Sequence, residues 1–290
     1  MDGRPAIGGE SRVAAELRAR LQTSGSDRLS LAVGMILGHA FAVLEDLKPS
    51  EAEFEQLLQF LTDVGYATDA RRQEWVLLAD VFGFSDHVAG CSARRDPVAT
   101  PSTLAGPFYR PDAPRLAHGA NICRDGVGQP LAVSGRVTST DGQPICGAEV
   151  EVWHANGEGL YENQDPDGQP EHNLRGRFVT DADGGFAFHT VRPGGYSLPD
   201  DGPVGRLARR LGLSLDRPAH LHFAVTAPGH HRLVTAIFDG SDSAIDRDAL
   251  SAVKPALIGT FRHQPAGHSL DVALVLLPDG ASKSNHLQKG

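Results

Sequence analysis

The sequence predicts a mainly β protein in which an antiparallel sandwich of two sheets follows an α-helical region. Three observations support this prediction. Apolar residues recur at helical spacing within the first hundred residues. A proline-rich stretch over residues 96–114 then interrupts that period. After it, short alternating runs of apolar and polar residues are separated by glycine-containing turns, as in β-sandwiches. We therefore expect an N-terminal helical dimerisation region over residues 1–100 and a β-sandwich domain over residues 101–290.

Several segments of the first region have helical patterning. Residues 11–22 are charged and amphipathic, and residues 69–84 form a later helical segment. Between them, Ser50 is placed to cap a helix while Glu53 reaches back, in the spacing of a capping box. The apolar residues that follow at helical spacing are Phe54, Leu57, Leu58, Leu61 and Val64. We predict a helix that follows Ser50 and ends at Gly65.

Residues 29–44 are nearly all apolar and raise the question of a membrane span. The run has 16 residues and contains Ser30, His39 and two glycines. A helix needs about 20 apolar residues to cross a bilayer. A helix that is apolar on most of its surface is commonly buried in a core or in a contact between subunits. We expect no membrane span here.

The second region contains several segments that read as strands. Residues 131–155 read as a strand, an Asp-Gly turn and a second strand, and residues 176–191 repeat this pattern. Further strands are predicted over residues 219–226, 232–239 and 268–277. Alternation along such strands directs one set of side chains into a core and the other set to the opposite face.

Composition limits the classes of partner and the cellular compartment. The formal net charge is −9, which makes nucleic acid an unfavourable partner. The three cysteines are an odd number without Cys-x-x-Cys spacing, so a disulfide framework is not expected. The first ten residues contain no hydrophobic signal segment. We expect a cytoplasmic protein.

The segment "RPAHLHFAV" places two histidines one residue apart in a predicted strand. His220 and His222 share one face of that strand. The apolar residues Leu221, Phe223 and Val225 share the other face and suit a core. Two imidazoles that project together suit metal ligation, but a polar strand face that contacts solvent has the same pattern.

Two of the four tyrosines lie in glycine-rich surroundings, Tyr161 in "WHANGEGLYENQDPDG" and Tyr196 in "VRPGGYSLPDDGPVG". Each fits a packing or turn position. A bound cation favours the phenolate form of tyrosine, and a phenolate is a hard oxygen ligand suited to ferric iron. Two phenolates with two neutral imidazoles would offset most of the charge of Fe(III).

The segments "WHANGEGLY", "PGGYSLPDDGP" and "RPAHLHF", in this order and at these separations, resemble the iron-binding motifs of the intradiol ring-cleavage dioxygenases. In addition, "LAGPFYRPDAP" resembles the loop that leads into the catalytic sandwich of that family. The stretches "HAFAVLEDLKPSEAEFEQLLQFLTDVG" and "RQEWVLLADVFG" are similar to its N-terminal dimerisation helices. The resemblance extends from residue 25 to residue 277.

This resemblance implies a non-haem Fe(III) ion bound by Tyr161, Tyr196, His220 and His222. It implies cleavage of a catecholic ring by O2 between the two hydroxyl-bearing carbons, with both oxygen atoms incorporated. It also implies catalytic roles for two residues. Tyr196 would take up a phenolic proton when substrate binds, and Arg217 would steady negative charge on the substrate ring. Without the resemblance, Arg217 reads as a surface residue.

Within the family, "YSLPDDGPVGRLARRLG" and "DRDALSAVKPAL" are more similar to the members that convert hydroxyquinol (benzene-1,2,4-triol) to a maleylacetate-type dicarboxylate. Asp80 would then accept a hydrogen bond from the third ring hydroxyl. An exposed helix charge is the other interpretation of Asp80. The other residues that the resemblance places along the substrate pocket are Leu77, Leu104, Pro107, Phe108, Leu198, Pro199, Arg217 and Leu250.

Two positions depart from the pattern of the family. Ala236 stands where these enzymes carry a glutamine or histidine, and Ser251 stands where a larger aromatic residue is usual. The first change removes a polar group near the iron ligands, and the second would widen the pocket. Two alternatives therefore remain at this point. One is cleavage of catechol or a substituted catechol to cis,cis-muconate or its analogue, and the other is a non-enzymatic β-sandwich binding module.

The resemblance also bears on assembly. It implies a homodimer through the N-terminal helices, which would explain the apolar run at residues 29–44. Members of the family hold a phospholipid between these helices, so a bound phospholipid at the dimer interface is an expectation here.

Overall fold

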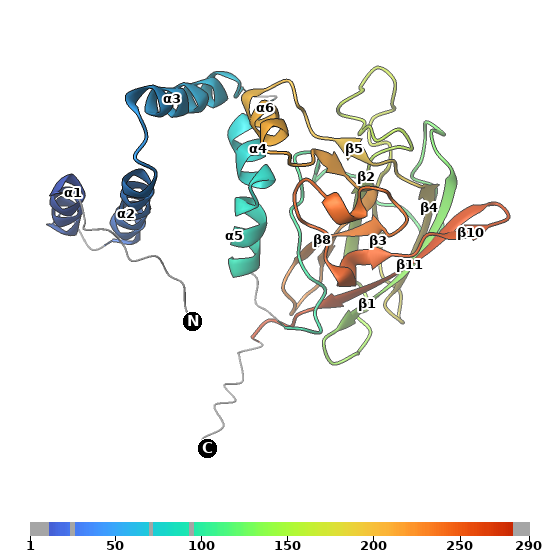
Figure 1. Ribbon diagram of the computed structural model, residues 1–290. Coiled ribbons are helices and arrows are strands. Elements are labelled where there is room, and N and C mark those ends of the chain that lie inside the picture. The colour runs from blue at the N-terminus through green and yellow to red at the C-terminus, as the bar shows by residue number, and fades with distance from the viewer. Residues whose placement is uncertain (1–11, 24–26, 70–71, 93–95, 281–290) are drawn as a thin grey trace. The chain divides into compact units, whose positions relative to one another are not determined.

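The computed structural model describes residues 12–23, 27–69, 72–92 and 96–280. The chain forms two compact units, of which the first ends at Tyr66 and the second begins at Ala67 (Figure 1). The helical segment predicted over residues 69–84 therefore belongs to the same unit as the strands.

The first unit contains three helices. They are α1 (Arg12–Thr23), α2 (Arg28–Leu47) and α3 (Glu51–Tyr66). The capping box at the start of α3 is confirmed, because the Ser50 amide donates to Glu53 over 2.8 Å and the Glu53 amide donates to the Ser50 hydroxyl over 3.3 Å. The helix continues through Gly65 and ends at Tyr66, one residue later than predicted.

Helix α2 is longer than the apolar run that predicted it, and α1 packs against it. The Asp27 carboxylate caps its first turn by accepting a hydrogen bond from the Ser30 amide over 2.7 Å. By length and composition alone, α2 is the one described helix that could cross a membrane. Large apolar side chains that are exposed on α2 within this chain are Leu29, Leu31, Met35, Ile36, Val43 and Leu47.

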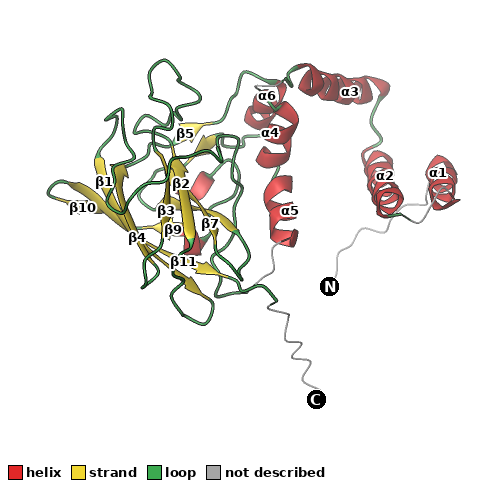
Figure 2. Cartoon of the chain, turned by 180° about the vertical axis from the view of Figure 1, so that it is seen from behind, coloured by secondary structure: helices red, strands yellow, loops and turns green. Residues whose placement is uncertain are grey.

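The second unit contains a pair of helices followed in the chain by two sheets. The helices are α4 (Glu74–Val81) and α5 (Phe84–Ser92). One sheet has the strand order β10 (Arg262–Gln264), β11 (Gly267–Leu276), β1 (Pro130–Ser139), β4 (Gly185–Val191). The other sheet has the order β3 (Arg175–Val179), β2 (Glu149–His154), β7 (His220–Thr226), β8 (Leu233–Asp239), β9 (Ile258–Gly259). Figure 2 shows both sheets from behind, with the long strands in yellow. The two-sheet sandwich predicted from alternation is confirmed.

The core lies between the two sheets. Phe186 on β4 packs against Phe223 on β7, with ring centroids 6.2 Å apart, and Phe178 stacks on Phe188 at 5.2 Å. Gly135 on β1 faces Phe186 across the strand pair, and a Cβ there would lie 2.2 Å from that ring. Glycine at residue 135 therefore makes room for a large aromatic ring in the core.

Two connections were not evident from the alternating pattern. The first and last long strands, β1 and β11, pair in parallel, so the four-stranded sheet is not wholly antiparallel. The proline-rich loop joins the sheets by backbone hydrogen bonds, from Thr100 to Val275 of β11 and from Thr103 to Val234 of β8. This loop lies over the outer face of the five-stranded sheet, on which the candidate site is built.

Three short elements complete the surroundings of that site. The hairpin of β5 (Tyr196–Ser197) and β6 (Asp216–Arg217) flanks helix α6 (Pro203–Arg210). The single-turn helices η1 (Ile245–Arg247) and η2 (Pro255–Leu257) follow β8. Two of the expected site residues lie on these elements, Tyr196 on β5 and Arg217 on β6.

Candidate metal centre

Strand β7 brings its two histidines together on the face away from the core. The Nε2 atoms of His220 and His222 lie 3.1 Å apart, and both side chains are buried. Two nitrogens that each lie about 2.1 Å from one ion are roughly 3 Å apart when their bonds to it are near a right angle. Residues Leu221 and Phe223, on the opposite face, are fully buried in the core, as predicted.

The surroundings of the two imidazoles leave their Nε2 atoms available. His220 Nδ1 lies 2.7 Å from the Pro218 carbonyl, so Nδ1 carries the hydrogen and Nε2 presents a lone pair. The indole of Trp153 stacks on His222, with centroids 4.9 Å apart and planes inclined by 4°. Burial, followed by the charge of Arg217, lowers the pKa of His220 to about 3, and burial lowers that of His222 well below its ordinary value. Both histidines are therefore neutral, as metal ligands must be.

The two glycine-rich loops bring the nominated tyrosines to the same place. Tyr161 is buried and lies edge-on to Tyr196, with ring centroids 5.9 Å apart. The ring of Tyr196 lies 5.7 Å from that of His220. Gly159 has a φ of +83°, and a Cβ there would lie 2.5 Å from the Gly195 carbonyl. Glycine at residue 159 thus permits the close approach of the two tyrosine-bearing loops.

The phenol of Tyr161 depends on a neighbouring positive charge for ionisation. Burial, reinforced by the neighbouring Tyr196, raises the pKa of Tyr161 well above its ordinary value. A cation beside the phenol has the opposite effect. Its ring is held by Phe108, which stacks on it with centroids 4.4 Å apart. Two neutral imidazoles beside two neighbouring phenols form a donor set that fits a hard trivalent metal ion.

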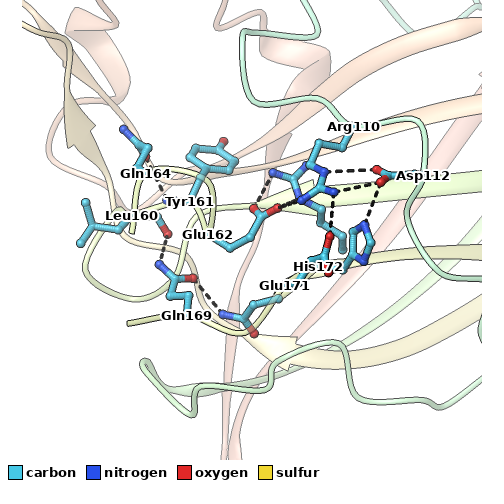
Figure 3. A network of polar contacts seen from close by, with 11 residues as sticks. Arg110, Asp112, Leu160, Tyr161, Glu162, Gln164, Gln169, Glu171 and His172 are labelled. Carbon is cyan, nitrogen blue, oxygen red and sulfur yellow. Dashed lines mark hydrogen bonds and ion pairs between the residues drawn. The ribbon is translucent and has the colours of Figure 1, made fainter. Parts of the chain in front are cut away.

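A buried ion pair anchors the loop that carries Tyr161. The carboxylate of Glu162 accepts two hydrogen bonds from Arg175 on β3, over 2.8 and 2.6 Å, and both side chains are almost fully buried. Figure 3 shows this loop, in which the Tyr161 amide also donates to Gln164 over 2.9 Å. The network fixes the backbone on both sides of Tyr161.

Figure 3 also contains an exposed group of possible cation ligands. Asp112, Glu171 and His172 lie within 4.8 Å of one another. Arg110 forms ion pairs with both carboxylates, at 2.9 and 3.2 Å, and therefore already offsets their charge. This group belongs to the network that supports the Tyr161 loop.

Arg217 lies beside the four nominated ligands, although it reads as a surface residue in isolation. It pairs with Tyr196 in the β5–β6 hairpin, and its side chain is 5% exposed. Burial alone would lower its pKa, but electrostatic interactions with Tyr196 and Asp248 outweigh burial and raise it. Its Nε donates to Asp248 over 3.0 Å. Sequence reasoning missed Asp248, because no motif distinguishes it among its charged neighbours.

Helix α4 presents Asp80 toward this guanidinium. Burial raises the pKa of Asp80, while a hydrogen bond from Ser85 and the charge of Arg217 oppose that rise. Asp80 is half-buried, and it interacts electrostatically with Arg217. The interpretation of Asp80 as an exposed helix charge is not supported.

The remaining pocket residues lie on the segments that surround the ligands. Gly106 lies against His222, since a Cβ there would be 3.9 Å from Nε2. Leu104 lies two residues before Gly106, and Pro107 follows it. Leu198 and Pro199 follow Tyr196, and the Leu198 amide donates to Leu215 over 2.8 Å. Leu77 is half-buried on α4, one turn before Asp80, and Leu250 is buried next to Ser251. Phe108 is the one aromatic residue among them, and its ring stacks on that of Tyr161.

Sequence reasoning also missed the residue that fastens α4 to α6. Glu74 is fully buried, accepts the Val204 amide of α6 over 3.0 Å and pairs with Arg72 at 2.7 Å. Arg72 reaches Asp201 at 2.9 Å on the same loop. In the sequence, Glu74 lies at the start of the predicted helix, where an acidic residue is ordinary, so nothing marked it as a buried contact.

The two departures lie at the site. Ala236 on β8 is directly opposite His222 and fully buried, and His222 Nδ1 has no hydrogen-bond partner among the described residues. Ser251 has a φ of +52°, an uncommon backbone conformation for a residue other than glycine. The first departure is consistent with the loss of a polar neighbour to the ligands.

Comparison with known proteins places these features in a family. The sequence matches the family models described as "Dioxygenase" over residues 104–277 and "Catechol dioxygenase N terminus" over residues 26–100. Hydroxyquinol 1,2-dioxygenase of Rhizobium sp. (strain MTP-10005) is 42% identical over 253 residues, which cover 87% of this chain and 86% of that protein. Catechol 1,2-dioxygenase of Candida albicans is 36% identical over 207 residues, which cover 70% of this chain and 68% of that protein.

The fold agrees with the same relationship. The solved structure of hydroxyquinol 1,2-dioxygenase from Pseudomonas putida DLL-E4 superposes with a TM-score of 0.88 at 33% identity, and covers 92% of this chain and 98% of that one. Both halves of the sequence, the sandwich and the order of the tyrosine and histidine motifs point the same way. The chain belongs to the intradiol ring-cleavage dioxygenases, a family of oxidoreductases.

Proposed function

We propose that the protein cleaves hydroxyquinol with O2 between its two adjacent hydroxyl-bearing carbons and releases a maleylacetate-type dicarboxylate. The names of the Rhizobium and Pseudomonas relatives support hydroxyquinol as the substrate. The Candida relative keeps catechol as the second candidate. Family membership rules against the non-enzymatic binding module that the sequence alone left open.

In this proposal Tyr161, Tyr196, His220 and His222 hold a non-haem Fe(III) ion. The observation that carries the proposal is the 3.1 Å separation of two buried imidazole Nε2 atoms beside two tyrosines whose ring centroids lie 5.9 Å apart. Bound Fe(III) supplies a Lewis-acid charge that draws electron density from a catecholate ring and prepares it for reaction with O2.

The chain's own residues bind and orient the ring. Tyr196 is half-buried and is the tyrosine placed to accept a proton from a substrate hydroxyl. Arg217 supplies a buried positive charge for the anionic ring. Asp80 accepts a hydrogen bond from the third hydroxyl, which catechol lacks. The pocket segments on α4, the proline-rich loop and the β5–α6 loop enclose the ring and limit the access of water.

We also propose that the protein is a cytoplasmic homodimer that associates through α2. The exposed apolar side chains of α2 and the N-terminal family match over residues 26–100 support this assembly. A subunit contact would bury the face of α2 that resembles a membrane span, and it offers a place for a phospholipid.

The test is a comparison of substrates with iron-reconstituted protein. A tyrosinate-to-iron charge-transfer band should make the protein red-brown, and kcat/KM for hydroxyquinol should exceed that for catechol. A colourless, iron-free protein after reconstitution would reject the iron site. A higher kcat/KM for catechol would reject the choice of substrate.

Tyr161→Phe sharpens the test of the ligand set. Phenylalanine keeps the stack on Phe108 and removes only the oxygen, so the visible band should bleach and turnover should be lost. Tyr109→Phe is the matched control, because Tyr109 packs edge-on against Trp153 and hydrogen-bonds to Glu151. This control should keep the band. A full-intensity band in Tyr161→Phe would remove Tyr161 from the ligands.

A further inference from the structure

Asp248 is a buried carboxylate that the site described above does not yet explain. It follows η1, and its side chain is 2% exposed. One oxygen accepts a hydrogen bond from Arg217 Nε over 3.0 Å. The other accepts the Ala252 amide over 2.8 Å. Both oxygens are thus engaged, each with a different part of the site.

The first contact determines how Arg217 can act. The guanidinium is held at its Nε edge, and its Cζ lies 6.0 Å from the centroid of the Phe238 ring. Within the described part of the chain, the side-chain hydrogen bond of Arg217 is the one from Nε to Asp248. A planar guanidinium held at one edge directs its remaining donors along fixed lines. Because Asp248 engages only the Nε edge, the Nη donors of Arg217 are left to bind a substrate ring.

The second contact holds a wall of the pocket. The hydrogen bond from the Ala252 amide to Asp248 closes the segment 248–252. This segment contains Leu250, which is buried, and Ser251, which has a left-handed backbone conformation. The Ala249 amide donates to the Asp216 carbonyl, over 2.8 Å, next to Arg217. One carboxylate thus links the charged group to the apolar wall.

We propose that Asp248 is a positioning residue for ring cleavage that acts through Arg217. This inference rests on the proposed function, since it assigns Arg217 to the substrate ring. A solely structural ion pair would affect the stability of the fold and leave turnover of the folded enzyme unchanged. The inference predicts the reverse, a loss of turnover in a folded protein that binds iron.

Asp248→Asn is the first variant. Asparagine replaces one of the two acceptor oxygens by an NH2 group, which cannot accept, so one of the two contacts loses its acceptor. We expect kcat/KM for hydroxyquinol to fall by about 10-fold or more. The charge-transfer band should remain, because no nominated ligand is changed. Asp246→Asn makes the same chemical change two residues away on exposed η1 and should keep wild-type kcat/KM.

A double-mutant cycle tests whether Asp248 acts through Arg217. In an Arg217→Gln background, Asp248→Asn should reduce kcat/KM by less than about 3-fold. If Asp248→Asn does not fold, Asp248→Glu replaces it in the cycle, because it keeps the charge but displaces the guanidinium. Wild-type kcat/KM in the folded variant, or equal losses in both backgrounds, would overturn the inference. Wild-type protein that cleaves neither triol nor catechol would instead overturn the proposed function.

Discussion

At the scale of single residues, the neighbours that contact each side chain of the site determine its chemistry. The Pro218 carbonyl sets the tautomer of His220, and Phe108 holds the ring of Tyr161. Arg217 is oriented by Asp248 and lies within reach of the charge of Asp80. The same residue types without these neighbours would be a polar strand face, a packed phenol and a surface cation. Their chemistry comes from their surroundings.

Asp80 gives a prediction at this scale. Asp80→Asn should lower the ratio of kcat/KM for hydroxyquinol over catechol by about 10-fold or more, because the third hydroxyl loses a charged acceptor. Asp86→Asn on α5 is the matched control, since its carboxylate pairs with Lys254, and it should keep the ratio. An unchanged ratio in Asp80→Asn would show that Asp80 does not read the third hydroxyl.

The same carboxylate predicts a pH dependence of the preference for hydroxyquinol. Burial raises the pKa of Asp80 above its ordinary value of 3.8, so the carboxylate takes up its proton at a higher pH than an exposed aspartate. The preference should be complete above the raised pKa and be lost as the pH falls through it. The ratio of kcat/KM values, measured across pH, should vary in the wild type and stay flat in Asp80→Asn.

At the scale of elements, buried carboxylates fasten the segments that bear the pocket. Glu162 and Arg175 tie the Tyr161 loop to β3, and Glu74 ties α4 to the start of α6. Gly202 lies at this second junction, where a Cβ would be 2.4 Å from the Glu74 carboxylate. The first amides of a helix have no acceptor within it. At the start of α6, the Glu74 carboxylate accepts one of them, the Val204 amide. The pocket is therefore held by polar contacts as well as by apolar packing.

Glu74 gives a prediction at this scale. Glu74→Gln should lower the free energy of unfolding by roughly 2–4 kcal/mol, because Arg72 loses its buried partner while the Val204 amide can keep an acceptor. Asp201→Asn removes the other partner of Arg72. The Asp201 side chain is 72% exposed, so this change should cost no more than about 1 kcal/mol. Denaturant unfolding measures both variants. Equal losses of unfolding free energy in the two variants would mean that the buried contact stabilises the fold no more than the exposed one.

At the scale of the whole molecule, the chain combines a sandwich that carries the site with a helical unit that has an unpaired apolar face. Helix α2 exposes Ile36 and Met35 by 67% and 58% within this chain. Exposed apolar surface of this kind marks a contact with another molecule. In the proposed homodimer this surface would be buried against a second copy of the chain.

The assembly gives the final prediction. Ile36→Glu should convert the proposed dimer to a monomer, because a carboxylate would be buried in an apolar contact without a partner. Light scattering should then report half the wild-type mass. Val98→Glu, at a position 59% exposed in the second unit, should leave the mass unchanged. A wild-type protein that is already monomeric, or an Ile36→Glu protein that remains dimeric, would contradict the role of α2.

The sequence by itself determined the features that depend on local pattern. Alternation predicted the strands and the shared face of His220 and His222, the Ser50–Glu53 spacing predicted a helix start, and the motif order indicated the family. Only the tertiary structure decided the contacts between distant segments. Asp248 and Arg217 are 31 residues apart, and Glu74 and Val204 are 130 apart, with no periodicity to connect them. The parallel pairing of β1 with β11 has the same origin, because no short turn sets the direction of strands so far apart in the chain. Local spacing is encoded by backbone geometry, whereas a buried carboxylate finds its partner only when the fold removes both from water.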